Sequence, residues 1–237
     1  MKTGMFKYSL LAATMAFSGL TMAANPSATL LVKGQVSTGT CTAVLSTPDI
    51  NLGTTSTDKL PATGSYTVKS SIVTELNVDC TSPLKYQISL TDNRSDSAED
   101  ATVLGLDSSY NGGLMGLGTT TDGIKIGGYQ VGFASIKNAV NGSTTISPAR
   151  LRKTMAADAQ WEIPNNQVWA MAPVNNLVGK TTGSSYIAIG KSGEDEPCAT
   201  TSATLVFQSN YYLSSELQSI TDQEQIDGSV TFNLDYL

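Results

Sequence analysis

The sequence predicts an all-β protein, an antiparallel sandwich or barrel, and three observations support this fold class. Short segments with apolar residues at alternating positions recur along most of the chain, and period-two alternation is typical of half-buried β-strands. Clusters of Gly, Ser, Thr, Asn and Asp separate these segments, as expected of turns between strands. Helical periodicity is weak throughout. Many short strands joined by polar turns favour an antiparallel sandwich or barrel, and we expect one domain.

Residues 1–23 are predicted to be a secretory signal peptide. Two lysines precede an apolar run at residues 8–20, and Thr21 and Ala23 supply the small residues of a cleavage site. The run is shorter than the roughly 20 residues that cross a bilayer. We expect an exported mature chain of 214 residues, with 12 basic and 20 acidic side chains and a net charge of −8. This acidic balance argues against nucleic acid or anionic lipid as a partner.

The first predicted strand, residues 28–36, begins shortly after the cleavage site. Its alternate positions are apolar or glycine, namely Ala28, Leu30, Val32, Gly34 and Val36. The segment could be the first strand of its own domain. It could equally be an arm that adds to the sheet of a neighbouring molecule, where main-chain hydrogen bonds give affinity and alternate side chains fill pockets.

Three cysteines constrain the covalent structure. In an oxidising compartment two of them should form a bridge. We predict Cys41–Cys80, because each flanks a predicted strand in the better-patterned N-terminal half of the chain. Cys198 lies in a polar loop beside Pro197. It is either an unpaired surface thiol or one half of an intermolecular bridge, and the sequence leaves both open.

The middle of the chain predicts further strands and one helix. The strands are expected at residues 74–80, 85–90, 128–136, 185–190 and 203–213. The helix is expected at 147–161, where Ser147 can act as the N-cap and Pro148 suits the first helical position.

The last predicted strand occupies residues 228–237. Its apolar side chains alternate at Val230, Phe232, Leu234 and Tyr236. No further segment follows to shield whatever lies next to this strand. Proteins normally cover or pair an exposed apolar sheet edge, so we expect another strand to lie beside it.

The composition removes most catalytic chemistry. The chain contains no histidine, which excludes Ser–His–Asp and Cys–His nucleophile systems and His-bearing zinc sites. The acidic stretch 192–197 lacks the alternating oxygen ligands of a calcium loop, so we interpret it as a solvated turn. A carboxylate pair of the glycosidase type stays open. We therefore expect no enzyme, no cofactor and no metal site.

Several segments together resemble a known family of exported proteins. The opening "KGQVSTGTC" at 33–41, Cys80 at the end of "LNVDC" and the penultimate Tyr236 resemble chaperone–usher fimbrial subunits. More closely, "LNVDCTSPLKYQISLTDNR", "MGLGTTTDGIKIGGYQVGF" and "DGSVTFNLDYL" resemble the GltF-like family, a divergent branch of these pilin-type subunits. The chain carries extra sequence around 92–123 and 137–185 relative to a compact pilin.

The resemblance implies an immunoglobulin-like, pilin-type antiparallel sandwich that lacks its last strand. Residues 24–37 would be a donor-strand extension and residues 38–237 the sandwich domain, with long loop insertions. A periplasmic chaperone would lend a strand beside the terminal strand and hold the carboxylate of Leu237. The arm of the next subunit would then replace it, with Gly34 placed where no side chain fits.

The resemblance also implies a function, a location and partners. We expect a structural subunit of a surface fimbria, exported to the periplasm and then to the surface of a Gram-negative cell. Its partners would be the chaperone, an outer-membrane usher and neighbouring subunits. An alternative is a tip adhesin or minor subunit that binds a host glycan or surface receptor. Aromatic residues that could stack on sugars are Tyr110, Trp161, Trp169, Tyr211 and Tyr212.

Overall fold

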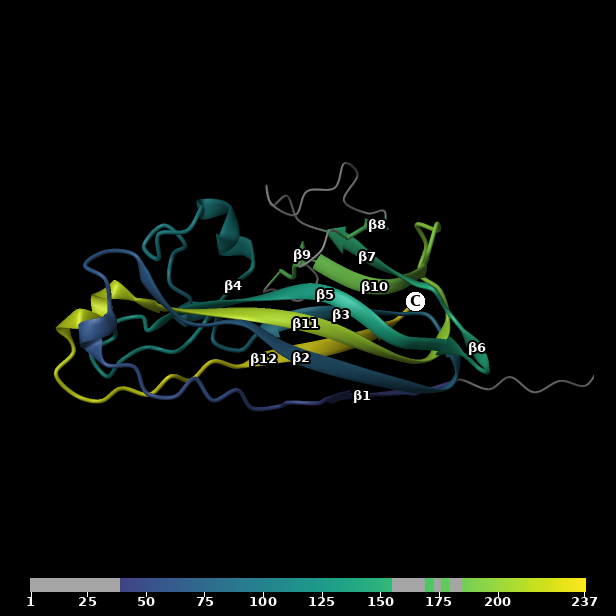
Figure 1. The fold of residues 1–237 in the computed structure, drawn as a ribbon, viewed down its shortest axis with the longest axis horizontal. Helices are drawn as coiled ribbons and strands as arrows, with labels where there is room; N and C mark the ends of the chain where they lie inside the picture. The colour runs from purple at the N-terminus through teal and green to yellow at the C-terminus, as the bar shows by residue number, and fades with distance from the viewer. Residues whose placement is uncertain (1–38, 155–168, 173–175, 180–184) are drawn as a thin grey trace, which may run out of the picture. The chain divides into compact units, whose positions relative to one another are not determined.

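A computed structural model describes residues 39–154, 169–172, 176–179 and 185–237, all of them within the unit Thr38–Leu237. The predicted signal peptide, the predicted donor strand at 28–36 and Trp161 lie outside the described residues. Within these ranges the chain forms two antiparallel sheets joined by loops and short 3-10 turns (Figure 1). No described helix has the length and apolar character needed to span a membrane.

The larger sheet is built around three long inner strands. Its main strand order is β1(Cys41–Leu45), β2(Ser65–Leu84), β11(Thr200–Ser214), β5(Gly127–Asn141) and β4(Leu114–Gly116). Two short strands also pair with β5, namely β6(Thr144–Thr145) and β9(Asn176–Leu177). Every pairing is antiparallel. The 3-10 turns are η1(Thr57–Lys59), η2(Ser95–Ser97), η3(Ser108–Gly112) and η4(Ser215–Ser219).

The second sheet has the C-terminal strand at one edge. Its strand order is β12(Val230–Tyr236), β3(Tyr86–Asp92), β10(Ser185–Lys191), β7(Pro148–Thr154) and β8(Ala170–Met171). The apolar faces of the two sheets pack together in one core. In this core the ring centroid of Phe207 on β11 lies 5.6 Å from that of Phe133 on β5. It lies 5.0 Å from the ring centroid of Phe232 on β12, in an edge-on arrangement. The predicted antiparallel β-sandwich is therefore confirmed.

The alternation of apolar residues predicted the strands correctly, but the helix predicted from Ser147 and Pro148 is wrong where the structure describes it. Each of the five predicted internal strands falls on an observed strand, the one at 85–90 beginning one residue before β3, and the C-terminal strand predicted at 228–237 contains β12. The predicted helix at 147–161 is wrong over Pro148–Thr154, which pairs with β10 from Lys191↔Pro148 to Ser185↔Thr154. Pro148 fits the first residue of a strand as well as the first turn of a helix, because either position can do without its N–H. Residues 155–161 lie outside the described part.

The predicted Cys41–Cys80 disulfide is confirmed. The two residues lie directly opposite each other in the β1–β2 ladder, with their Cα atoms 4.0 Å apart and 39 positions apart in sequence. The bridge fastens the edge strand β1 to the long strand β2. In the chain-entropy model, a closed loop of this size stabilises the folded state by about 4 kcal/mol.

Cys198 is the free cysteine of the described residues. Its N–H donates to Ile189 O at 2.9 Å, and its half-buried side chain packs against the core. Burial raises the pKa of the Cys198 thiol, so the group stays a protonated and weak nucleophile near neutral pH.

Replacing the bridged pair with serine, Cys41→Ser with Cys80→Ser, is expected to lower the free energy of unfolding by about 4 kcal/mol. Denaturant unfolding of the mature chain measures this. The matched control is Cys198→Ser, which leaves the bridge intact. A double-serine variant as stable as the control would contradict the role given to the bridge.

Candidate functional site

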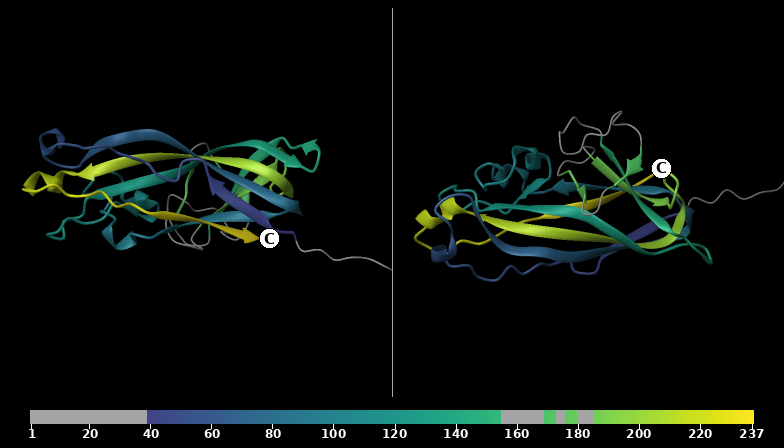
Figure 2. Two further views of the ribbon diagram at one scale, coloured as in Figure 1. Left: turned by 90° about the horizontal axis from the view of Figure 1, so that it is seen from below. Right: turned by 45° about the horizontal axis from the view of Figure 1, so that its top comes forward.

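The C-terminal strand β12 lies at a sheet edge. Among the described residues its one strand neighbour is β3, and the two strands pair from Val230↔Asp92 to Tyr236↔Tyr86. Figure 2 shows β12 and β1 converging near the C-terminus, each at the edge of its own sheet. The other long side of β12 therefore has no strand partner in the described structure.

Hydrogen bonds just beyond β12 show which of its residues face the open side. The N–H of Asn93 donates to Ser229 O at 3.0 Å, and the N–H of Leu237 donates to Lys85 O at 3.0 Å. Because bonding alternates along an antiparallel pair, the odd-numbered residues of β12 bond to β3. The even-numbered residues direct their N–H and C=O groups to the open side. These are Val230, Phe232, Leu234 and Tyr236.

The edge strand β1 shows the same arrangement. The N–H of Thr81 donates to Thr40 O at 2.9 Å, and the N–H of Ser46 donates to Glu75 O at 2.8 Å. By the same alternation, the even-numbered residues of β1 bond to β2. The residues whose backbone groups face away from β2 are Cys41, Ala43 and Leu45.

The two edges meet at one end through the penultimate tyrosine. The N–H of Cys41 donates to the hydroxyl oxygen of Tyr236 at 2.8 Å. This hydroxyl thus satisfies a backbone donor that no strand satisfies on the open side of β1. The Tyr236 ring is 52% exposed, so the side chain contributes here mainly through its hydroxyl rather than through burial. The contact closes the space between the edges at the disulfide end.

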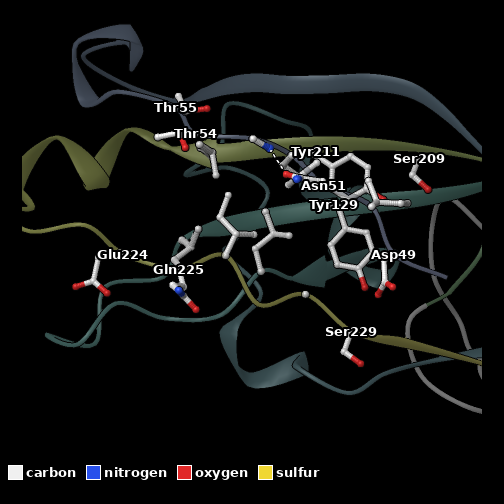
Figure 3. Close-up of a pocket in the computed structure, with 18 of the residues that line it drawn as sticks. Asp49, Asn51, Thr54, Thr55, Tyr129, Ser209, Tyr211, Glu224, Gln225 and Ser229 are labelled. Atoms are coloured by element: carbon white, nitrogen blue, oxygen red, sulfur yellow. Dashed lines mark hydrogen bonds between the residues drawn. The ribbon is translucent and has the colours of Figure 1, made fainter. Parts of the chain in front are cut away.

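Beyond this closed end, a groove of about 1020 Å³ separates the two sheet edges (Figure 3). One wall is the segment 47–57, which follows β1, and the other is the segment 220–230, which leads into β12. The first wall is held at its centre, where Ile50 and Leu52 pack against the core. Gly228 lets the second wall approach the floor closely, since a Cβ there would meet Leu117 Cδ2 at 3.1 Å.

The floor of the groove is apolar. It is formed by Leu117, Ile126, Tyr129, Val131, Phe207, Tyr211, Leu213 and Leu217, all at most 6% exposed. Tyr129 and Tyr211 stack with their ring centroids 5.3 Å apart. Burial raises the pKa of both phenols, so they remain neutral at physiological pH. The floor consequently carries no charge.

One polar group of the floor has no partner. Thr74 of β2 is 6% exposed and lies opposite Phe207 in the ladder. Its Oγ1 makes no hydrogen bond in the described structure. A buried hydroxyl without a hydrogen-bond partner lowers the stability of the fold by about 1–3 kcal/mol. The hydroxyl of Thr74 is therefore open to a hydrogen bond from a group that enters the groove.

The rim of the groove is acidic. Three carboxylates line it, those of Asp49, Asp222 and Glu224, and no lysine or arginine is among the lining residues. Glu224 accepts hydrogen bonds from the N–H and hydroxyl of Thr121. Neutral polar side chains of both walls, including Asn51, occupy the rest of the rim, as Figure 3 shows.

This combination suits an extended chain better than a small reactant. The unpaired edges of β1 and β12 lead into this groove, where Leu45, Val230 and Phe232 line it. An added strand can pair with such edges while its alternate side chains cover an apolar floor. The described residues contain no group of three or more side chains able to hold a metal ion.

The predicted groove-strand residues occupy these positions in part. Val230, Phe232 and Leu234 pack against the core, and the first two also line the groove. Tyr236 closes its end, and Leu237 is exposed beyond it. The predicted donor residues Ala28, Leu30, Val32, Gly34 and Val36 lie outside the described residues.

The aromatic residues suggested for sugar binding are not brought together. Tyr211 belongs to the groove floor, while Tyr110 and Tyr212 pack on a separate small cluster around Leu104. Trp169 lies elsewhere, with Lys153 Nζ 5.3 Å from its ring centre. Trp161 lies outside the described residues.

Sequence reasoning missed both walls of the groove. The segments 47–57 and 220–230 are rich in Thr, Ser, Asp and Gln, which is the composition of ordinary loops. A signal did exist in the alternation of Ile50 and Leu52 within the first segment. Residues 192–196 of the acidic stretch are exposed, as predicted, whereas Pro197 is buried and forms a bridge with Gly190. The preceding Lys191 Nζ lies 3.2 Å from a carboxylate oxygen of Glu194.

Comparison with known proteins gives one finding. A family model described as "Protein of unknown function (DUF1120)" matches residues 30–130, less than half of the chain. The matched part includes β1, β2, β3 and the wall 47–57, but neither β11 nor β12. No curated protein matches the chain.

Replacing the penultimate tyrosine, Tyr236→Phe, is expected to destabilise the closed end by about 1 kcal/mol, the usual net value of one hydrogen bond. The sharper measurement is amide hydrogen exchange, which should accelerate at Cys41 because its N–H loses its acceptor. Tyr186→Phe, on β10 of the same sheet, is the control. Unchanged exchange at Cys41 would show that the hydroxyl contact is dispensable.

Proposed function

We propose that the protein is a structural subunit of a surface fimbria, assembled by the chaperone–usher route through donor-strand complementation. The observation that carries the proposal is the pair of sheet edges without strand partners in the described residues that lead into an apolar groove. In this proposal the described domain is an immunoglobulin-like, pilin-type sandwich of the GltF-like branch that lacks its last strand. A strand from another molecule completes it.

The chemistry of the groove supports a strand as its occupant. The even-numbered residues of β12 offer backbone groups for pairing, and the floor offers a continuous apolar surface. The donor would be residues 28–36 of a neighbouring subunit, with four aliphatic residues and Gly34 at alternate positions. Burying those four side chains contributes on the order of 4–12 kcal/mol before ordering costs. Strand hydrogen bonds add to this, which suits a durable polymer.

The same groove explains the need for a chaperone. Before assembly, the exposed edges and floor would favour aggregation. A periplasmic chaperone would lend a strand along β12 and hold the carboxylate of Leu237, and an outer-membrane usher would exchange it for the next subunit's arm. The proposal assigns no catalytic activity, cofactor or metal to the protein.

Deleting residues 24–36 is expected to abolish polymer formation, because the groove of the next subunit then has no donor strand. Electron microscopy and gel filtration of the exported protein measure this. A finer test compares Val32→Asn, on the groove-facing side of the arm, with Gln35→Asn on the opposite side. Only Val32→Asn should reduce the polymer. Normal fibres from the deletion variant would refute the role of the arm.

Replacing a groove-strand residue with a polar one, Phe232→Ser, is expected to lower the periplasmic level of the protein severalfold. The change removes the ring that packs on Phe207 and costs about 2–4 kcal/mol, and it weakens the surface that a chaperone strand would cover. The matched control is Thr231→Ser, on the exposed face of the same strand. Equal accumulation of both variants would count against the proposal.

A tip adhesin or minor subunit is the second candidate, and the insertion after β3 favours it. This insertion has a small apolar cluster of its own, in which Tyr110 and Tyr212 flank Leu104. A shaft subunit has no evident need for the extra cluster. Binding of the complemented subunit to a glycan array, lost in Tyr110→Ala, would favour an adhesin. Absence of glycan binding would favour a shaft subunit.

A further inference from the structure

We propose that the groove selects and aligns its donor strand by charge, through Lys33 of a second copy of this chain and the carboxylates at the groove rim. The inference rests on the proposed function, since it concerns the same groove. It adds a residue that determines the register of the strand, on the side of the donor that does not enter the apolar floor.

The acceptor side of this pair is the acidic rim. Asp49 and Asp222 are exposed, and neither takes part in any of the ion pairs found among the described residues. Glu224 is held by Thr121. With three carboxylates and no basic side chain lining the groove, the mouth of the groove favours a strand that carries positive charge.

The donor side follows from the sequence of the arm. Residues 24–37 contain one charged side chain, Lys33. If the alternating residues such as Leu30 and Val32 cover the floor, the period of two places Lys33 on the opposite face of the strand. That face looks toward the rim. The arm of a second copy is thus complementary to the groove in both its apolar and its charged positions.

The position of the carboxylates makes the pairing informative about strand direction. Asp49 belongs to the wall after β1, and Glu224 belongs to the wall before β12. Figure 3 places them toward opposite ends of the drawn groove. The carboxylate that couples to Lys33 therefore reports which way the donor strand runs.

The expected effect is moderate but specific. An exposed charge pair changes an equilibrium constant by about 1.5- to 5-fold. Charges at a rim act mainly on the association rate and its salt dependence, because screening becomes strong beyond about 8 Å at physiological ionic strength.

The experiment uses labelled synthetic peptides of residues 24–37 and the mature chain. The chain is refolded from denaturant in the presence of excess peptide, because the peptide must compete with the arm of the chain itself for the groove. Bound peptide is then measured by gel filtration. Compared with wild type, Lys33→Arg should bind equally, Lys33→Gln about 3-fold more weakly and Lys33→Glu about 10-fold more weakly. The wild-type advantage should shrink at 1 M salt.

Variants of the chain locate the partner. Asp49→Asn, Asp222→Asn and Glu224→Gln are each tested with the wild-type and Lys33→Gln peptides, and Asp195→Asn in the exposed turn is the matched control. Weaker binding of the wild-type peptide alone to one rim variant supports the inference. Equal binding of the wild-type and Lys33→Gln peptides to every variant overturns it and leaves the donor-strand function intact. Failure of the wild-type peptide to bind at all contradicts the donor-strand function itself.

Discussion

The two unpaired sheet edges are the constraint on which the rest of the structure depends. A sandwich buries one face of each sheet, but its edge strands still carry rows of backbone donors and acceptors that need partners. Here the open edges of β1 and β12 lead into one apolar groove, which Leu45, Val230 and Phe232 line, so the unpaired backbone groups adjoin the incompletely covered core. A single added strand meets both needs. No set of separate small ligands satisfies two continuous ladders in this way.

The closed end gives the groove a fixed boundary. The Cys41–Cys80 bridge holds β1 on β2, and the Tyr236 hydroxyl then joins β1 to β12. Both contacts lie at the same end, whereas the far end is bounded by loops that form no ladder with each other. An added strand therefore has a defined stopping point at one end of the groove. The covalent and hydrogen-bonded anchors thus serve the position of the groove as well as the stability of the fold.

The sequence was sufficient to predict the paired strands but not the two walls of the groove. The period of two at Val230, Phe232 and Leu234 predicts both a strand and its core side, because one face of that strand is buried. The disulfide could be placed because its cysteines flank such strands. The wall 47–57 reads as a loop, since tertiary contacts at Ile50 and Leu52, not local propensity, hold it. At Pro148 the local signal fits helix and strand equally, and pairing with β10 decides between them.

An apolar floor alone does not fix the register of a donor strand. A slip by one residue would turn the apolar side chains away from the floor and is strongly disfavoured. A slip by two residues keeps Leu30 and Val32 on the floor, so apart from the position of Gly34 the apolar contacts change little. The same slip moves Lys33 by about 7 Å, close to the distance over which salt screens a charge. One outward charge facing localised carboxylates therefore adds to the difference in free energy between the two registers. This is the physical reason to expect the acidic rim to matter for assembly.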